Sequence, residues 1–322
     1  MLRILIFLMF TCVGHSQILP SQQAVHYKKD SGAPSSGSRT FTNCSSTGIN
    51  GPSQSDCNTA YTSTDLNGEV TVNNGIQEWT VPYTDTYVIE VWGAKGGYAG
   101  SCDNGQIGGT ACRGVNGARM KGTFSLTKGE IIRIAVGQMG ESYVYGVKGG
   151  GGGGGGTFVA KGSNHSGATA LIVAGGGGGG HYYAGSTPKE GQTSESGLGN
   201  ASTWSSGQNE YGSGGGGSWG SDGENGTYGT LGGKGWANLL VGGTHCTGGH
   251  SHWARGDGGF GGGGGGSWAG GPAGGYNGGP KVKSYGNPTP GGGGGGSYNS
   301  GSSQDNSAGA GDDHGKVIIS WQ

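Results

Sequence analysis

Residues 149–161 read GGGGGGGGTFVAK, a glycine run that passes without a break into an apolar segment typical of a β-strand. Four further glycine runs follow, at residues 175–180, 214–217, 261–266 and 291–296. Glycine loses more conformational freedom on folding than any other residue, and inside a regular element it costs roughly 0.5–1 kcal/mol relative to alanine. The 84 glycines among 322 residues are therefore either flexible linkers or are ordered by something other than side-chain burial.

One route to order is the polyproline II helix, which polyglycine adopts with three residues per turn. Because no Cβ protrudes, such helices can approach closely and pair backbone N–H with backbone C=O groups of their neighbours. Bulky residues near the runs would close the ends of such a bundle: Phe158, His181, Trp219, Phe260, Trp268 and Tyr298. Flexible linkers are the alternative. The charged fraction of 11% and aromatic fraction of 9% favour an ordered chain, since disordered chains are usually charge-rich and poor in aromatics.

Short β-branched and aromatic stretches bounded by turn residues predict strands. They are residues 70–72, 78–81, 86–92, 118–126, 130–136, 157–161, 170–174 and 316–321. Within TYVIEVW (86–92), Tyr87, Ile89 and Val91 share one face. No helical stretch of any length is expected. The pattern predicts a mainly β protein built as a β-sandwich.

The last strand, residues 316–321 (KVIISW), is apolar and must bury one face. We expect it to join a sheet formed by the N-terminal strands. Residues 175–315 then become an insertion within one domain, anchored at both ends.

The N-terminus predicts a signal peptide over residues 1–16. Arg3 precedes ten apolar residues, and Gly14 and Ser16 place small side chains before the cleavage point. This apolar stretch is shorter than the roughly 20 residues that a membrane span needs, and no transmembrane segment is expected elsewhere. We predict a flexible leader over residues 17–40, a single domain over residues 41–322, and a secreted, extracellular protein.

Cysteine spacing suggests two short-range disulfides, Cys44–Cys57 and Cys102–Cys112. Cys246 is then left as a free thiol, which gives a route to self-association or to a disulfide-linked dimer. Glycosylation sequons occur at Asn43, Asn164, Asn200 and Asn225. Asn43 is the least expected to carry a glycan because it lies beside a probable disulfide.

Several segments carry a resemblance to a known family. They include FTNCSSTGINGPSQSDCNTAY (41–61), GIQEWTVP (75–82), YVIEVWGAKGG (87–97), LIVAGGGGGG (171–180) and GGFGGGGGGSWAGGPAGGYNGG (258–279). In this order they resemble the glycine-rich extracellular domain of the anaplastic lymphoma kinase and leukocyte tyrosine kinase receptors. The resemblance implies a sandwich like the tumour-necrosis-factor fold with an inserted bundle of polyglycine II helices. In those receptors the region takes part in binding small protein cytokines and in dimerisation, but no motif transfers ligand-binding residues to this chain.

One local cluster is typical of metal ligands, although weakly. Residues 245–252 (HCTGGHSH) hold His245, Cys246, His250 and His252, whose nitrogen and sulfur atoms suit zinc or copper. Solvated side chains in a glycine-rich loop are the alternative, and no cofactor is otherwise expected. The triplet Asp312-Asp313-His314 resembles part of a triad or a cation site, but its place in a turn before the last strand favours a structural role.

No enzyme is expected, because the chain lacks a nucleophile elbow and a phosphate-binding loop. A net charge of −1 and a pI near 6.7 provide no basic stripe for nucleic acid. The sequence favours a structural or matrix component outside the cell. The alternative is a soluble binding module for a cytokine-like protein or a glycan, with exposed aromatic residues as contacts.

Overall fold

The computed structural model describes residues 36–99, 112–142, 149–181, 187–198, 212–247, 255–282 and 291–322. They belong to one compact unit, Pro34–Gln322. The predicted signal peptide, residues 1–16, lies outside the described residues.

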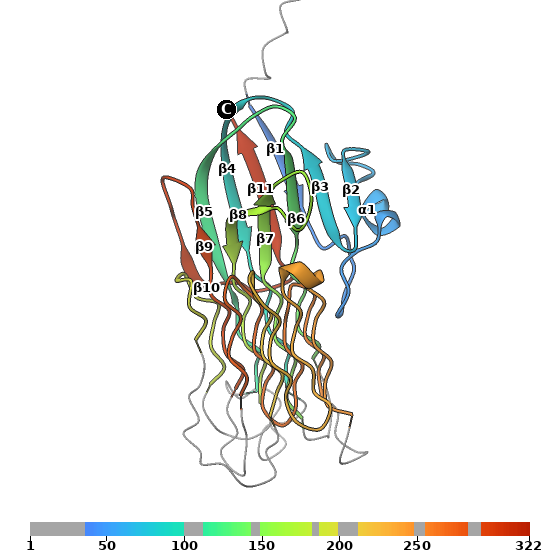
Figure 1. Ribbon diagram of the computed structural model, residues 1–322, viewed down its shortest axis with the longest axis vertical. Coiled ribbons are helices and arrows are strands. Elements are labelled where there is room, and N and C mark those ends of the chain that lie inside the picture. Colours follow the sequence, from blue (N-terminus) through green and yellow to red (C-terminus); the bar gives the residue numbers. More distant parts are fainter. Residues whose placement is uncertain are drawn as a thin grey trace, which may run out of the picture. The chain divides into compact units, whose positions relative to one another are not determined.

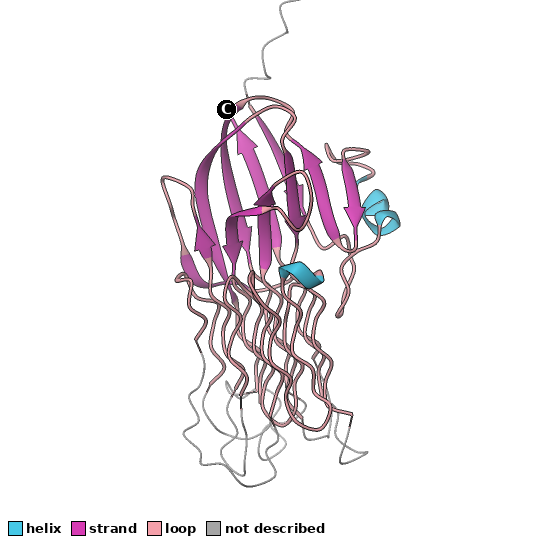
Figure 2. Cartoon of the chain, viewed as in Figure 1, coloured by secondary structure: helices cyan, strands magenta, loops and turns pink. Residues whose placement is uncertain are grey.

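The strands form two antiparallel sheets (Figure 2). Sheet A has the order β1 (Gly37–Phe41), β11 (Lys316–Trp321), β4 (Asp85–Trp92), β5 (Gly117–Leu126), β10 (Ser307–Gly311). Sheet B has the order β2 (Val70–Asn73), β3 (Ile76–Thr80), β6 (Ile131–Ala135), β7 (Thr157–Lys161), β8 (Thr169–Ala174), β9 (Tyr298–Asn299). This confirms a mainly β protein with two sheets, as the strand pattern predicts.

The main core lies between the sheets. In β4 the side chains of Tyr87, Ile89 and Val91 are fully buried while their neighbours along the strand are half-buried or exposed, as the alternation predicts. They belong to one apolar cluster with Ile132 and Ile134 of β6. Each fully buried aliphatic side chain contributes about 1.5–3 kcal/mol.

The C-terminal strand joins the N-terminal strands as expected. β11 pairs with β4 on one side, with Ile319 opposite Ile89, and with β1 on the other. The domain therefore begins earlier than residue 41, because β1 starts at Gly37. That strand (GSRTF) lacks an apolar alternation, and its place is fixed by backbone pairing with β11.

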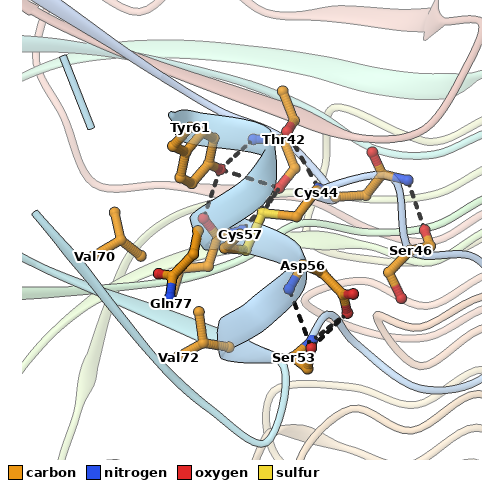
Figure 3. Close-up of a disulfide and its surroundings, with 12 residues drawn as sticks. Thr42, Cys44, Ser46, Ser53, Asp56, Cys57, Tyr61, Val70, Val72 and Gln77 are labelled. Carbon is orange, nitrogen blue, oxygen red and sulfur yellow. Dashed lines mark hydrogen bonds between the residues drawn. A yellow bond between two sulfur atoms is a disulfide. The ribbon is translucent and has the colours of Figure 1, made fainter. Parts of the chain in front are cut away.

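The expectation of no helix is wrong for residues 54–61. Helix α1 spans Gln54–Tyr61 and begins with a capping box, in which the Ser53 hydroxyl accepts from the Asp56 N–H and the Asp56 carboxylate accepts from the Ser53 N–H (Figure 3). The helix is short and mostly polar, so no helical periodicity marks it in the sequence. Its cap and the Cys44–Cys57 disulfide hold it in place.

A hydrogen-bond network ties α1 to the strands on either side (Figure 3). The Tyr61 hydroxyl donates to Gln77 Oε1 of β3 at 2.7 Å, and Gln77 Nε2 donates to the Thr42 carbonyl at 2.8 Å. The Thr42 N–H in turn donates to the Tyr61 hydroxyl at 2.9 Å. Tyr61 and Gln77 are buried, and the polar atoms of their side chains are paired by these bonds, as burial requires.

The glycine-rich segments run side by side beyond one end of the sheets (Figure 1) and bond to one another through their backbones. The bonds of the first run repeat every three residues. The N–H groups of Gly150, Gly153 and Gly156 donate to residues 261–267, those of Gly151 and Gly154 to 177–180, and those of Gly152 and Gly155 to 138–141. A period of three is expected of a helix with three residues per turn. The runs are thus ordered and are not linkers in this structure.

Side chains are excluded from the middle of this region. A methyl group built on Gly154 would overlap the backbone of Ala94 and Lys95, and one on Gly153 would overlap the backbone of Pro272. Glycine is required here for close approach between chains. The assignment of polyglycine II helices and the likeness to the tumour-necrosis-factor fold stay predictions.

A second apolar cluster joins the glycine-rich region to sheet B. Phe158 of β7 packs with Trp236, Leu240 and Phe260. Trp236 lies in a short 3₁₀ helix (η2, Trp236–Asn238) and stacks on Trp219 with ring centroids 4.6 Å apart. The aromatic residues beside the runs therefore pack at the junction, in agreement with the capping role predicted for Trp219 and Phe260.

Candidate ligand-binding pocket

A cavity of about 340 Å³ lies at the end of sheet A where the strands pass into the glycine-rich region. Its lining comes from three places in the chain: Thr42 and Asn43 after β1, Trp92 at the end of β4, and residues 310–316, which run from the end of β10 through a turn to the first residue of β11. Its volume is near the lower end of the range for small-molecule sites.

The turn before β11 forms one wall and is held by backbone bonds. The Lys95 N–H donates to the Asp313 carbonyl at 3.0 Å, and the Gly315 N–H donates to the Gly137 carbonyl at 2.8 Å. The Asp313 carboxylate also accepts from the His314 N–H at 2.8 Å. The carboxylates of Asp312 and Asp313 are consequently presented to solvent from a fixed turn.

His314 is held as a neutral imidazole. The Met139 N–H donates to His314 Nδ1 at 3.0 Å, so Nδ1 is the acceptor and the ring proton lies on Nε2. Burial lowers the pKa of His314 below its ordinary value, which agrees with this neutral form. The His314 side chain is thereby engaged by the backbone of Met139. The structural role expected for the whole turn triplet stays a prediction.

Trp92 and Lys316 also line the cavity. They are register partners on adjacent strands, and Lys316 Nζ lies 4.3 Å from the centroid of the Trp92 ring. Both side chains are half-buried. The cation fixes the orientation of the indole by a cation–π contact.

The pocket combines four kinds of contact: an indole, an ammonium group, two carboxylates, and the Asn43 and Thr42 side chains. Hydroxyl-rich ligands need hydrogen-bond acceptors and donors within a few ångströms of an apolar surface, and this lining supplies all three. Among the lining residues the structure describes, no Ser or Cys nucleophile is present.

The cysteine predictions are met where the structure describes them. Cys44 and Cys57 form a disulfide and Cys246 is a free thiol, as predicted. Cys112 is also disulfide-bonded, while Cys102 lies outside the described residues, so the Cys102–Cys112 pairing stays a prediction. Cys246 is buried with 3% of its surface exposed, and a disulfide to a second chain would require this region to open.

Of the predicted metal ligands, His245 and Cys246 lie in the described residues, and their side chains have different surroundings. His245 Nδ1 lies 2.7 Å from Asp257 Oδ1, whereas the Cys246 thiol is buried and burial raises its pKa. A thiol with a raised pKa is a poorer metal ligand, because the thiolate is the binding form. His250 and His252 lie outside the described residues.

The sequons fall into distinct surroundings. Asn164 and Asn225 are exposed, and each uses its side-chain oxygen to accept a backbone N–H. Asn43 instead uses its Nδ2, the atom that would carry a glycan, to donate to the Ser46 carbonyl at 2.6 Å. Asn200 lies outside the described residues.

The sequence analysis singles out Asp312, Asp313 and His314 among the lining residues, but it assigns no role beyond their strands to Trp92 and Lys316. The signal was their pairing across β4 and β11, which depends on knowing that residues 92 and 316 are opposite each other.

Comparison with known proteins gives a partial likeness. No family model matches the chain. A segment of 106 residues, 31% of the chain, is 33% identical to the leukocyte tyrosine kinase receptor of Mus musculus. The chain spans only 11% of the length of that receptor. The likeness supports a resemblance to the receptor's extracellular region and is compatible with an extracellular location. In the part of the chain that the structure describes, no helix has the length and apolar character of a membrane span.

Proposed function

We propose that this protein is a non-enzymatic, secreted recognition module whose pocket beside Trp92 accommodates one sugar unit of an extracellular glycan. The observation that carries the proposal is the lining of that pocket, which includes Trp92 together with Asp312 and Asp313. Sugars present apolar C–H faces and polar hydroxyls, so they need an aromatic surface and acceptors together. The likeness to a receptor's extracellular region supports a recognition role in general.

The negative charges of the pocket indicate which class of sugar it would bind. Exposed Asp312 and Asp313 repel sulfated and carboxylated sugars, while their oxygens accept from hydroxyl or amino groups. We therefore propose neutral or amino sugars. A glycan on Asn43 would block the pocket, and the engagement of Asn43 Nδ2 by the Ser46 carbonyl disfavours one.

The test is an array of neutral, amino and sulfated glycans probed with the full chain, followed by calorimetry on the best ligand. Asp312→Ala should weaken binding about tenfold, because it removes an acceptor that no described hydrogen bond uses within the fold. Glu69→Ala removes an exposed carboxylate elsewhere and should leave binding unchanged. The proposal fails if no glycan binds, or if both variants bind as the parent does. Saturable binding of a cytokine-like protein alone would favour the receptor-like alternative.

A structural role in an extracellular matrix is the second candidate. The interlocked backbone bonds of the glycine-rich region favour it, because they make a stiff unit whose order does not depend on side chains. This role requires assembly, so the protein would be extracted from tissue only under denaturing conditions. Ready extraction as a monomer would count against it.

A further inference from the structure

A second group of polar side chains lies in the glycine-rich region, apart from the pocket. Glu141, His245 and Asp257 each offer a ligand atom, and these atoms lie within 4.8 Å of one another. They come from three separate segments of the chain. Glu141 is exposed and the other two are half-buried, so an ion from solvent can reach them.

Backbone hydrogen bonds bring the three segments together. The Glu141 N–H donates to the Asp257 carbonyl at 2.8 Å, and the Asp257 N–H donates to Glu141 Oε2 at 3.0 Å. The His245 N–H donates to Asp257 Oδ1 at 2.6 Å. Each carboxylate is therefore oriented by a backbone N–H, and its remaining lone pairs are available to an ion.

The three segments are also hydrogen-bonded, through their backbones, to the glycine-rich region. The Gly152 N–H donates to the Glu141 carbonyl, and the Gly258 N–H donates to the Gly243 carbonyl. The group is thus mounted on rigid backbone, which is the condition for a preorganised site. The neighbouring cation, Arg255, directs Nη1 to the Cys246 carbonyl at 3.1 Å.

We propose that Glu141, His245 and Asp257 bind a divalent transition-metal ion of the zinc type. Imidazole nitrogen with carboxylate oxygen is a donor set that suits zinc, whereas calcium and magnesium prefer oxygen ligands alone. Three protein ligands leave the remaining position to water. His245 is retained from the ligand set expected from the sequence, while Glu141 and Asp257 replace Cys246.

The spacing requires only a small adjustment. Ligand atoms about 2.1 Å from a tetrahedral ion lie about 3.4 Å apart. His245 Nδ1 and Asp257 Oδ1, now 2.7 Å apart, would separate slightly as the ion replaces the proton between them. Glu141, on an exposed side chain, would move toward them. The ion would link the three segments in a region where few side chains contribute to stability.

The experiment uses the full chain, stripped with a chelator and titrated with ZnCl₂ by calorimetry. We expect one ion per chain and a higher melting temperature with zinc than without it, since a ligand that binds only the folded state stabilises it. Glu141→Gln keeps the acceptor for the Asp257 N–H but removes the charge, and should weaken zinc binding at least tenfold. Glu69→Gln is the matched control on an exposed carboxylate and should bind zinc as the parent does.

Two outcomes would overturn the proposal. One is absence of zinc binding, or equal affinity in the parent and in Glu141→Gln. The other is loss of zinc in a His250→Asn, His252→Asn double variant combined with full binding by Glu141→Gln, which would assign the ion to the histidines of residues 245–252. Zinc retained by the double variant and lost by Glu141→Gln supports the proposed ligands.

Discussion

The ammonium group of Lys316 lies over the indole ring of Trp92, with Nζ 4.3 Å from the ring centroid. Lys316 is the first residue of β11 and Trp92 is the last residue of β4, so the contact joins the ends of two neighbouring strands beside the pocket. It links the stability of the sheet to the shape of the proposed ligand site.

Lys316→Met keeps most of the side-chain stem but removes the charge. We expect the free energy of unfolding to fall by about 0.5–1 kcal/mol, the usual strength of an accessible cation–π contact. Urea denaturation measures it. The same substitution in a Trp92→Leu background should cost clearly less, and Lys128→Met, at an exposed lysine, should cost little in either background. Equal costs for Lys316→Met in both backgrounds would show that the contact contributes nothing.

Gly154→Ala tests the packing of the glycine-rich region. The added methyl group would overlap backbone atoms of Ala94 and Lys95, which cannot rotate away. We expect a loss of about 1–3 kcal/mol or more, the range for overpacking. Gly220→Ala is the matched control, because nothing lies within 4 Å of its added Cβ and its φ is not positive. Thermal unfolding of the two variants should separate them, and similar melting temperatures would contradict the packing described here.

His181 makes stability depend on pH. It is fully buried, and burial lowers its pKa from 6.5 to about 4. A lowered histidine pKa means that the unfolded chain binds the proton first, so the contribution is complete above pH 6.5 and is lost as pH falls toward 4. Between pH 7.5 and pH 5 the loss should be about 2 kcal/mol. His181→Gln should show a correspondingly flatter profile in urea denaturation. An unchanged slope in this variant would mean that other groups cause the acid sensitivity.

Glycan occupancy should differ among the sequons. We expect glycans on Asn164 and Asn225, whose side chains are exposed, and none on Asn43, whose Nδ2 is hydrogen-bonded to the Ser46 carbonyl. Mass spectrometry of tryptic peptides from protein secreted by cultured animal cells measures this. Ser46→Gly leaves the accepting carbonyl in place and should not create occupancy at Asn43. A glycan found on Asn43 would show that modification precedes folding of this turn.

The sequence predicts the parts of the fold that rest on side-chain alternation. Strand β11 begins and ends where KVIISW does, because its apolar residues alternate and mark the buried face. Strand β7 begins and ends where TFVAK does, as a short run that is buried on both faces. β10 (SAGAG) was not predicted, since its small residues carry no alternation and its position is set by pairing with β5. Helix α1 was missed for a similar reason, because a cap and a disulfide hold it instead of an apolar stripe.

Some residues of the candidate sites can likewise be predicted from the sequence, and others cannot. The Cys44–Cys57 pair follows from spacing, since only 13 residues separate the two. Glu141 and Asp257 gave no signal, because their proximity to His245 depends on which glycine segments are neighbours. Backbone hydrogen bonds determine which glycine segments are neighbours. Because these bonds do not depend on residue type, the sequence pattern cannot predict them.

The three-residue repeat of the bonds made by residues 149–156 sets a rule for insertions and deletions. Adding one glycine would rotate every later N–H by about 120°, toward the wrong neighbour, because the repeat contains three residues. Adding three would turn each later donor back toward the same neighbouring segment. Insertions and deletions in the glycine runs should therefore be tolerated in steps of three residues, because only such steps keep the N–H donors directed at the same neighbouring segments.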